Sequence, residues 1–236
     1  MISGNSDVMN ARTHRLAIYD MDKTITRRAT YTPFLIHAAR MRSPWRLSLL
    51  PLAGLAGVAF KSGLIGRGGV KEAAQRLILG PVLEAEEAER MAQGFAASLV
   101  PDSLFPGALR QIAADRAAGY RLVMATASYE FYVTAIAQAL GFDAVIATRS
   151  LRSADGAILP RIDGENCYGA AKRRMVERWM ADQGIARDEA DIRFYSDHVT
   201  DAPMLALADQ GFAVNAHPPL AKLAAEQGWP LLDWSA

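Results

Sequence analysis

The stretch LAIYDMDKT, residues 16–24, sets an apolar run directly before two aspartates. The run has the length and composition of a buried β-strand. Asp20 and Asp22 follow it two residues apart, so an extended backbone carries both carboxylates on the same side. Two like charges this close destabilise each other unless a cation or a proton lies between them. We therefore expect a cation-binding site at the end of this strand, although a solvated loop acid followed by a helix N-cap is an alternative.

Short apolar runs and longer helical patterns alternate along the rest of the chain. Further runs of strand length lie at residues 122–125, 144–147, 192–195 and 212–214. Helical patterns lie at residues 107–118, 129–140, 169–183, 202–208 and 218–227. The alternation predicts an α/β fold with a Rossmann-like three-layer core, in which helices cover both faces of a parallel sheet. Asp155-Gly156 predicts a β-hairpin within residues 150–162.

Residues 32–100 break this alternation. They have helical apolar content and no convincing strand, which predicts a helical insertion over the carboxyl edge of the sheet. In open α/β sheets, ligands bind at that edge. We therefore expect a catalytic core formed by residues 11–26 and 103–236, and an α-helical cap formed by residues 27–102.

The overall composition excludes several classes of protein. The chain has 236 residues, 51% of them hydrophobic, and 26 basic residues nearly balance 25 acidic ones. Long disorder, a coiled coil and a globally basic nucleic-acid-binding protein are excluded. The only cysteine, Cys167, excludes an internal disulfide and favours a reducing compartment. Residues 1–10 are polar and show no secretory signal, so we expect a cytoplasmic protein with no predicted protein partner.

The predicted cap has its own charge pattern. Residues 27–83 contain nine basic residues and a single acid, Glu72, for a local net charge of +8. Within them, residues 47–60 (LSLLPLAGLAGVAF) carry no charge and are too short to cross a bilayer comfortably. This apolar segment is either buried in the cap or lies against an anionic membrane at the inner membrane face.

Polar side chains follow two more of the predicted strands. Thr126, Ala127 and Ser128 follow residues 122–125 and precede a helix, an arrangement that can cradle an anion. Ser128 can equally serve as a helix N-cap. Asp197 and Asp201 follow residues 192–195, with Asp197 as a candidate third metal carboxylate.

Lys172 lies in the first turn of the helix predicted at residues 169–183. It shares one helix face with Met175, Val176 and Trp179, so it begins the stripe that should pack inward. An inward ammonium needs an anion, which a carboxylate cluster holding a phosphate would supply. Extension of the side chain to solvent is the alternative.

Together these segments resemble the four motifs of the haloacid dehalogenase superfamily of phosphohydrolases. The motifs correspond to Asp20-Met21-Asp22-Lys23-Thr24, to Thr126, to Lys172, and to Asp197 with Asp201. The chain is most similar to the phosphoserine-phosphatase-like subfamily IB, whose members insert a helical cap between the first two motifs. Asn166-Cys167-Tyr168-Gly169 before Lys172 fits the same subfamily.

The resemblance implies a role for each matching residue. Asp20 would be the nucleophile and a Mg²⁺ ligand, and Asp22 the general acid and base with its backbone carbonyl on the metal. Thr126 and the N–H groups after it, including that of Ala127, would bind the phosphoryl oxygens. Lys172 would offset the charge of Asp20 and phosphate. The last motif would complete the metal site through Asp197 and orient Lys172 or a metal-bound water through Asp201.

The expected activity is Mg²⁺-dependent hydrolysis of a small phosphorylated metabolite through an aspartyl-phosphate. Residues 26–31 lack the acid that phosphoserine phosphatases carry there, so recognition of an α-ammonium group is open. Arg27, Arg28 and Ser128 are candidate substrate contacts, and arginine suits a second anionic group. The alternatives are a phospholipid headgroup phosphatase at a membrane surface, a phosphotransferase and a non-enzymatic binding module.

Overall fold

The structure is a computed structural model that describes residues 12–63, 66–99 and 103–235, apart from the side chains of residues 56–61. The polar N-terminal stretch 1–10, position 11 of the predicted core and the end of the predicted cap at 100–102 lie outside these residues. Part of the apolar segment 47–60 also has side chains outside this description.

The described residues form one sheet of seven strands in the order β4-β3-β2-β1-β5-β6-β7. The strands are β1 (His14–Tyr19), β2 (Arg121–Tyr129), β3 (Ala144–Arg152), β4 (Ile158–Asp163), β5 (Ala190–Ser196), β6 (Gln210–Val214) and β7 (Leu231–Leu232). All neighbours pair in parallel except β3 and β4, which form the predicted hairpin. The α/β class is confirmed, and the short edge strand β7 is an addition to it.

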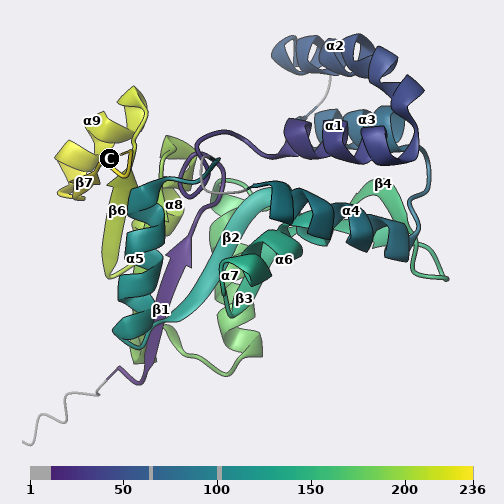
Figure 1. Ribbon diagram of the computed structural model, residues 1–236. Helices are drawn as coiled ribbons and strands as arrows, with labels where there is room; N and C mark the ends of the chain where they lie inside the picture. The colour runs from purple at the N-terminus through teal and green to yellow at the C-terminus, as the bar shows by residue number, and fades with distance from the viewer. Residues whose placement is uncertain (1–11, 64–65, 100–102, 236) are drawn as a thin grey trace, which may run out of the picture.

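Helices cover both faces of the sheet (Figure 1). One face packs against α5 (Pro106–Ala117) and α6 (Glu130–Ala139), and the other against α7 (Ala170–Asp182), α8 (Ala202–Leu205) and α9 (Pro218–Gln227). Strand β1 shows why, because its side chains alternate between the faces. Ala17 and Tyr19 belong to the core under α5 and α6, whereas Leu16 and Ile18 belong to the core under α7, α8 and α9.

The segment between β1 and α5 is helical where it is described. It contains α1 (Tyr31–Arg42), the 3₁₀ helix η1 (Pro44–Leu49), α2 (Leu50–Lys61), α3 (Arg67–Leu79) and α4 (Ala85–Ser98). Figure 1 shows α2 at the outer end of this insertion, with α1 and α3 between it and the sheet. Because α4 packs along α6 of the core, the division into a core and a separate cap remains a prediction.

The apolar segment 47–60 is divided between core and surface. Leu47, Leu49 and Leu50 pack against the main hydrophobic core, whereas Leu52 and Leu55 are 51% and 60% exposed. None of the helices within the described ranges is both long and apolar enough to cross a bilayer.

A buried carboxylate fixes the two strands that lead to the predicted site. Asp115 of α5 is fully buried and accepts hydrogen bonds from the Tyr19 hydroxyl at 2.5 Å and the Tyr195 hydroxyl at 2.9 Å. Arg193 of β5 pairs with the other oxygen at 2.6 Å. Tyr19 is the last residue of β1 and Tyr195 is the last but one of β5. This network therefore holds the two strand ends in register.

Candidate active site

Asp20 and Asp197 meet because β1 and β5 are neighbouring parallel strands. The Asp20 N–H donates to the Tyr195 carbonyl at 2.9 Å, which continues the ladder by one residue. Lys23 has a φ of 64°, in the left-handed region, where the chain turns back after the aspartates. The Thr24 hydroxyl then lies 3.4 Å from Asp20 Oδ2 and 3.5 Å from Asp197 Oδ1. Thr24 therefore lies between the two carboxylates.

Lys172 reaches the same point from α7. Its Nζ lies 2.7 Å from Asp20 Oδ1 and 2.6 Å from Asp201 Oδ2, and its side chain is 2% exposed. The Ser196 hydroxyl donates to the same oxygen of Asp201 at 2.8 Å. The structure thus brings together the nucleophile candidate, the lysine and both acids that follow β5.

The charges of this cluster do not balance. Burial, and then the neighbouring carboxylates Asp201 and Asp197, raise the pKa of Asp20 against the opposing effect of Lys172. Burial and Asp201 raise the pKa of Asp197 to about 6. Burial alone would lower the pKa of Lys172, but Asp20 and Asp201 raise it well above its ordinary value. Three carboxylates around one ammonium favour a further cation or bound protons.

The residues present fit a magnesium ion. Asp20 and Asp197 supply carboxylate oxygens, and the buried Asp201 Oδ1 has no hydrogen-bond partner. In the part of the chain that the structure describes, no three acidic, histidine or cysteine side chains form a ready-made metal cage. Mg²⁺ does not need one, since it binds one or two carboxylates and keeps several waters for a phosphate to replace.

Asp22 lies beside this cluster and is held by hydroxyl groups. Its Oδ1 accepts hydrogen bonds from the N–H and the hydroxyl of Thr30, both at 2.8 Å, and its Oδ2 accepts one from the Ser128 hydroxyl at 2.8 Å. Burial raises the pKa of Asp22, partly offset by these hydrogen bonds. A carboxyl group with a raised pKa is suited to donating and accepting a proton.

The predicted anion cradle lies at the carboxyl end of β2. The register between β2 and β3 shifts between Thr126 and Tyr129, so the backbone of Ala127 and Ser128 leaves the regular ladder. Thr126 and Ser128 are buried, and the Ser128 N–H donates to the Thr126 hydroxyl at 3.1 Å. Irregular strand ends of this kind often lie next to active sites.

Arg27 and Arg28 are not brought into the cluster. Both are exposed, and the Arg27 guanidinium lies over the Phe105 ring, 5.1 Å from its centroid. Together with Thr26 and Thr30 they line a separate cavity of about 270 Å³.

Other residues around the cluster were not predicted from the sequence. Thr30, Lys71 and Thr148 contact Asp22 or the cradle, and of these only Thr148 follows a predicted strand, the run at 144–147. The helical pattern does indicate that Lys71 points inward, because it shares one face of α3 with the buried Ala74, Gln75 and Ile78. The same criterion drew attention to Lys172.

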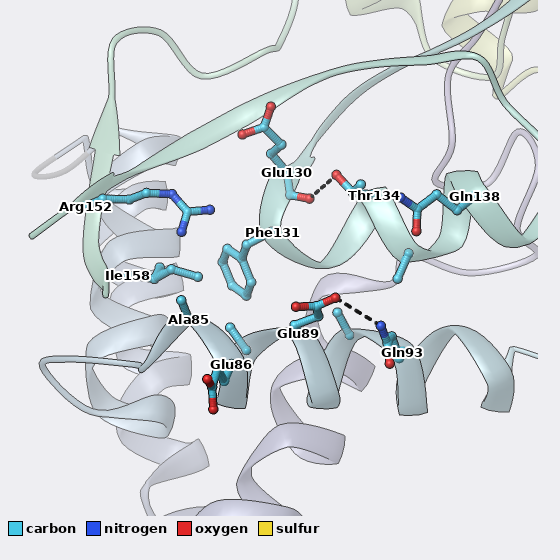
Figure 2. A pocket seen from close by; sticks show the side chains of 13 residues that line it. Ala85, Glu86, Glu89, Gln93, Glu130, Phe131, Thr134, Gln138, Arg152 and Ile158 are labelled. Carbon is cyan, nitrogen blue, oxygen red and sulfur yellow. Dashed lines mark hydrogen bonds between the residues drawn. The ribbon is translucent and has the colours of Figure 1, made fainter. Parts of the chain in front are cut away.

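A cavity of about 400 Å³ lies elsewhere, between α4 and α6 (Figure 2). Glu86, Glu89, Phe131 and Arg152 are among its lining residues, and none of the clustered aspartates is. Figure 2 shows Glu89 accepting a hydrogen bond from Gln93 on the same helix. The cavity is a gap along the seam between the insertion and the core.

Comparison with known proteins shows the family of the chain. Residues 17–206 match the haloacid dehalogenase-like hydrolase family, and the chain belongs to it. Protein CicA of Caulobacter vibrioides is 33% identical over 196 residues, which cover 83% of each chain.

Solved structures share the architecture. A protein of unknown function from Bordetella pertussis Tohama I superposes with a TM-score of 0.84 at 26% identity, covering 94% of this chain and 99% of that one. A phospho-aspartyl intermediate analogue of phosphoserine phosphatase superposes with a TM-score of 0.60, covering 94% of both chains. At 17% identity, the second likeness concerns the fold alone.

Proposed function

We propose that this phosphoric monoester hydrolase acts on a small phosphorylated metabolite through a covalent aspartyl-phosphate on Asp20, with Mg²⁺ as its cofactor. One observation carries the proposal: the buried Lys172 ammonium touches both Asp20 and Asp201, while Thr24 links Asp20 to Asp197. Charge compensation around a carboxylate is what phosphoryl transfer chiefly requires from a protein.

The first half of the reaction transfers the phosphoryl group to the protein. A carboxylate oxygen of Asp20 attacks phosphorus, and the bond between phosphorus and the ester oxygen breaks. Asp22 donates its proton to the departing oxygen, and its raised pKa supports the protonated form that this step needs. Lys172 offsets the negative charge of the phosphoryl group.

The second half releases phosphate. Asp22, now ionised, takes a proton from a water molecule, whose oxygen attacks the phosphorus of the aspartyl-phosphate. The bond between phosphorus and the Asp20 oxygen breaks, so phosphate leaves and the carboxylate is restored. We expect the Thr126 hydroxyl and the N–H groups after it, including that of Ala127, to bind phosphoryl oxygens, and Thr126 is buried beside the strand end.

Asp20, Asp197 and the backbone carbonyl of Asp22 would hold the metal, with Asp201 orienting Lys172. When bound, Mg²⁺ supplies positive charge that neutralises phosphoryl oxygens. The helical cap that we predict at residues 27–102 would cover this centre.

A phosphate-release assay with p-nitrophenyl phosphate tests the proposal. Release that depends on Mg²⁺ and stops on addition of a chelator supports it. A folded protein that releases no phosphate from this compound or from a panel of metabolite phosphomonoesters contradicts it.

A second candidate is hydrolysis of a phospholipid headgroup phosphate at an anionic membrane. The outer surface of the insertion favours it, because Trp45, Leu52 and Leu55 are each more than half exposed. The exposed Arg40 lies in the same segment, and basic residues beside exposed aromatic and aliphatic side chains suit an anionic membrane surface.

Vesicle co-sedimentation separates the two candidates. The membrane candidate predicts that the protein binds phosphatidylglycerol vesicles at low salt and that the triple variant W45S/L52S/L55S does not. The control is L109S, which replaces an exposed leucine on α5 and should retain binding. Absence of binding by the unaltered protein removes the membrane candidate and leaves the soluble one.

A further inference from the structure

Lys71 extends from α3 of the insertion into the predicted phosphate cradle. Its Nζ donates to the Ala127 carbonyl at 2.6 Å and to Asn166 Oδ1 at 3.0 Å. The ammonium also lies 4.2 Å from the centroid of the buried Tyr129 ring. Ala127 belongs to the turn that we expect to bind phosphoryl oxygens, so a residue of the insertion holds part of the core site.

Two acceptor oxygens beside the cradle need more hydrogen-bond donors than the Thr148 hydroxyl can supply. The Thr148 hydroxyl lies 2.7 Å from the same Ala127 carbonyl and 2.9 Å from the same Asn166 oxygen, and it accepts a hydrogen bond from the Cys167 N–H at 3.1 Å. A hydroxyl has one hydrogen and can serve only one of the two oxygens at a time. The Lys71 amino group can serve both, with three donors as an ammonium and two as the neutral amine, which burial makes accessible by lowering its pKa to about 7.

The direction of the Ala127 carbonyl determines the direction of the Ser128 N–H, because both belong to one peptide unit. A trans peptide unit is planar, so its carbonyl and the following N–H point in opposite directions. Because the register of β2 shifts between Thr126 and Tyr129, the regular ladder does not fix this peptide. Lys71 and Thr148 hold the carbonyl on one side, and the Ser128 N–H consequently points to the Thr126 hydroxyl on the other.

The neighbouring residue seats the same helix on a different part of the core. Glu72 Oε1 accepts a hydrogen bond from the Ile162 N–H of β4 at 2.7 Å. Glu72 therefore anchors α3 without touching the cradle. This gives a matched control, because a loosened insertion and a misdirected cradle can be told apart.

We propose that Lys71 is a positioning residue of the phosphate cradle, which it reaches from α3 and orders by fixing the peptide between Ala127 and Ser128. The proposal rests on the proposed function, since it requires residues 126–128 to bind the phosphoryl group. The ordering contact is local to Lys71, so it should be lost when the Lys71 donor is removed and kept when another contact of α3 is removed.

The test compares K71M, K71R and E72A with the unaltered protein. Inorganic phosphate is the main probe, measured as a competitive inhibitor of p-nitrophenyl phosphate hydrolysis, because it has no leaving group. We expect K71M to raise the phosphate inhibition constant about tenfold or more, as expected for loss of a charged hydrogen bond. kcat/KM should fall by a similar factor for p-nitrophenyl phosphate and for a phosphomonoester with a charged leaving group.

K71R, which restores a charged donor, should recover part of the phosphate affinity, and E72A should change it by less than about twofold. If K71M does not fold, K71Q carries the same prediction, because its side chain is one bond shorter than lysine and cannot carry a charge. Unchanged phosphate inhibition in the folded Lys71 variant overturns the proposal, as does an equal loss in E72A. A loss confined to the charged leaving group also overturns it, by making Lys71 a leaving-group contact. Failure of the proposed function is distinguishable, because the unaltered protein would then neither release nor bind phosphate.

Discussion

The ammonium of Lys172 lies 2.7 Å from the carboxylate of Asp20, although 152 positions separate the two residues along the chain. The contact joins the end of β1 to the first turn of α7 and is almost completely buried. A buried lysine is tolerated only when it is paired and hydrogen-bonded. Its partners here are Asp20 and Asp201, whose negative charge must be neutralised in the proposed reaction.

Replacement of Lys172 with methionine should destabilise the protein. It would leave Asp20, Asp197 and Asp201 buried without their compensating cation, and loss of one partner of a buried pair costs about 3–5 kcal/mol. Urea unfolding measures the loss, which Mg²⁺ should partly restore. R173A is the control, because the Arg173 pair with Glu177 is about 40% exposed and should contribute little. Equal effects of the two substitutions would contradict the assignment.

Stability without metal should fall as the pH rises. The pKa of Asp197 is raised to about 6 and that of Asp20 is raised further, so the folded state binds more protons than the unfolded state above about pH 4. Stability from these groups is complete below the ordinary carboxyl pKa and is lost as the pH rises through the raised values. Lys172, whose pKa is also raised, remains protonated throughout.

Magnesium should reverse this trend, because it binds the ionised carboxylates. The rise in melting temperature on adding Mg²⁺ should be larger at pH 8 than at pH 5. Differential scanning fluorimetry from pH 5 to pH 8, with and without the ion, measures it. A shift of the same size across the range would argue against carboxylate ligands with raised pKa values.

Replacement of Asp22 with asparagine should separate the two proton transfers. The variant keeps a polar group beside Thr30 and Ser128 but cannot donate an acid proton. We expect a fall in kcat of about 10² to 10⁴-fold with an alkyl phosphate. With p-nitrophenyl phosphate, whose leaving group needs no proton, the loss should be smaller and a burst should precede slow turnover. Equal losses with both substrates in the rate of phosphoryl transfer to the protein would show that Asp22 is not the acid.

The sequence predicts most of the sheet because each strand signal is local. The runs at 16–19, 122–125 and 192–195 all form strands, and the parallel order brings their carboxyl ends together. β7 has two residues, too few for an alternating pattern, and its place depends on pairing with β6. Arg27 and Arg28 are candidates by their charge and by their place soon after the first motif, and neither property predicts where a side chain points.

The hydroxyl and lysine contacts around the cradle are a different case. Thr148 contacts Ala127 because a register shift moves that backbone out of the ladder, and no residue pattern encodes the shift. Lys71 reaches the same carbonyl from a helix whose position depends on its packing. The sequence can single out Lys71 by its helix face and Thr148 by its place after a strand, but the atoms that they contact depend on tertiary structure.

Chemical trapping of the phosphorylated residue tests the central claim most directly. Protein quenched during turnover with Mg²⁺ and p-nitrophenyl phosphate is reduced with borohydride, which converts an aspartyl-phosphate to homoserine, and its peptides are analysed by mass spectrometry. The account predicts homoserine at position 20 in the unaltered protein, more of it in D22N, and none in D20N, which should remain folded but inactive. Turnover with no conversion, or with conversion at Asp22, Asp197 or another residue, would contradict it.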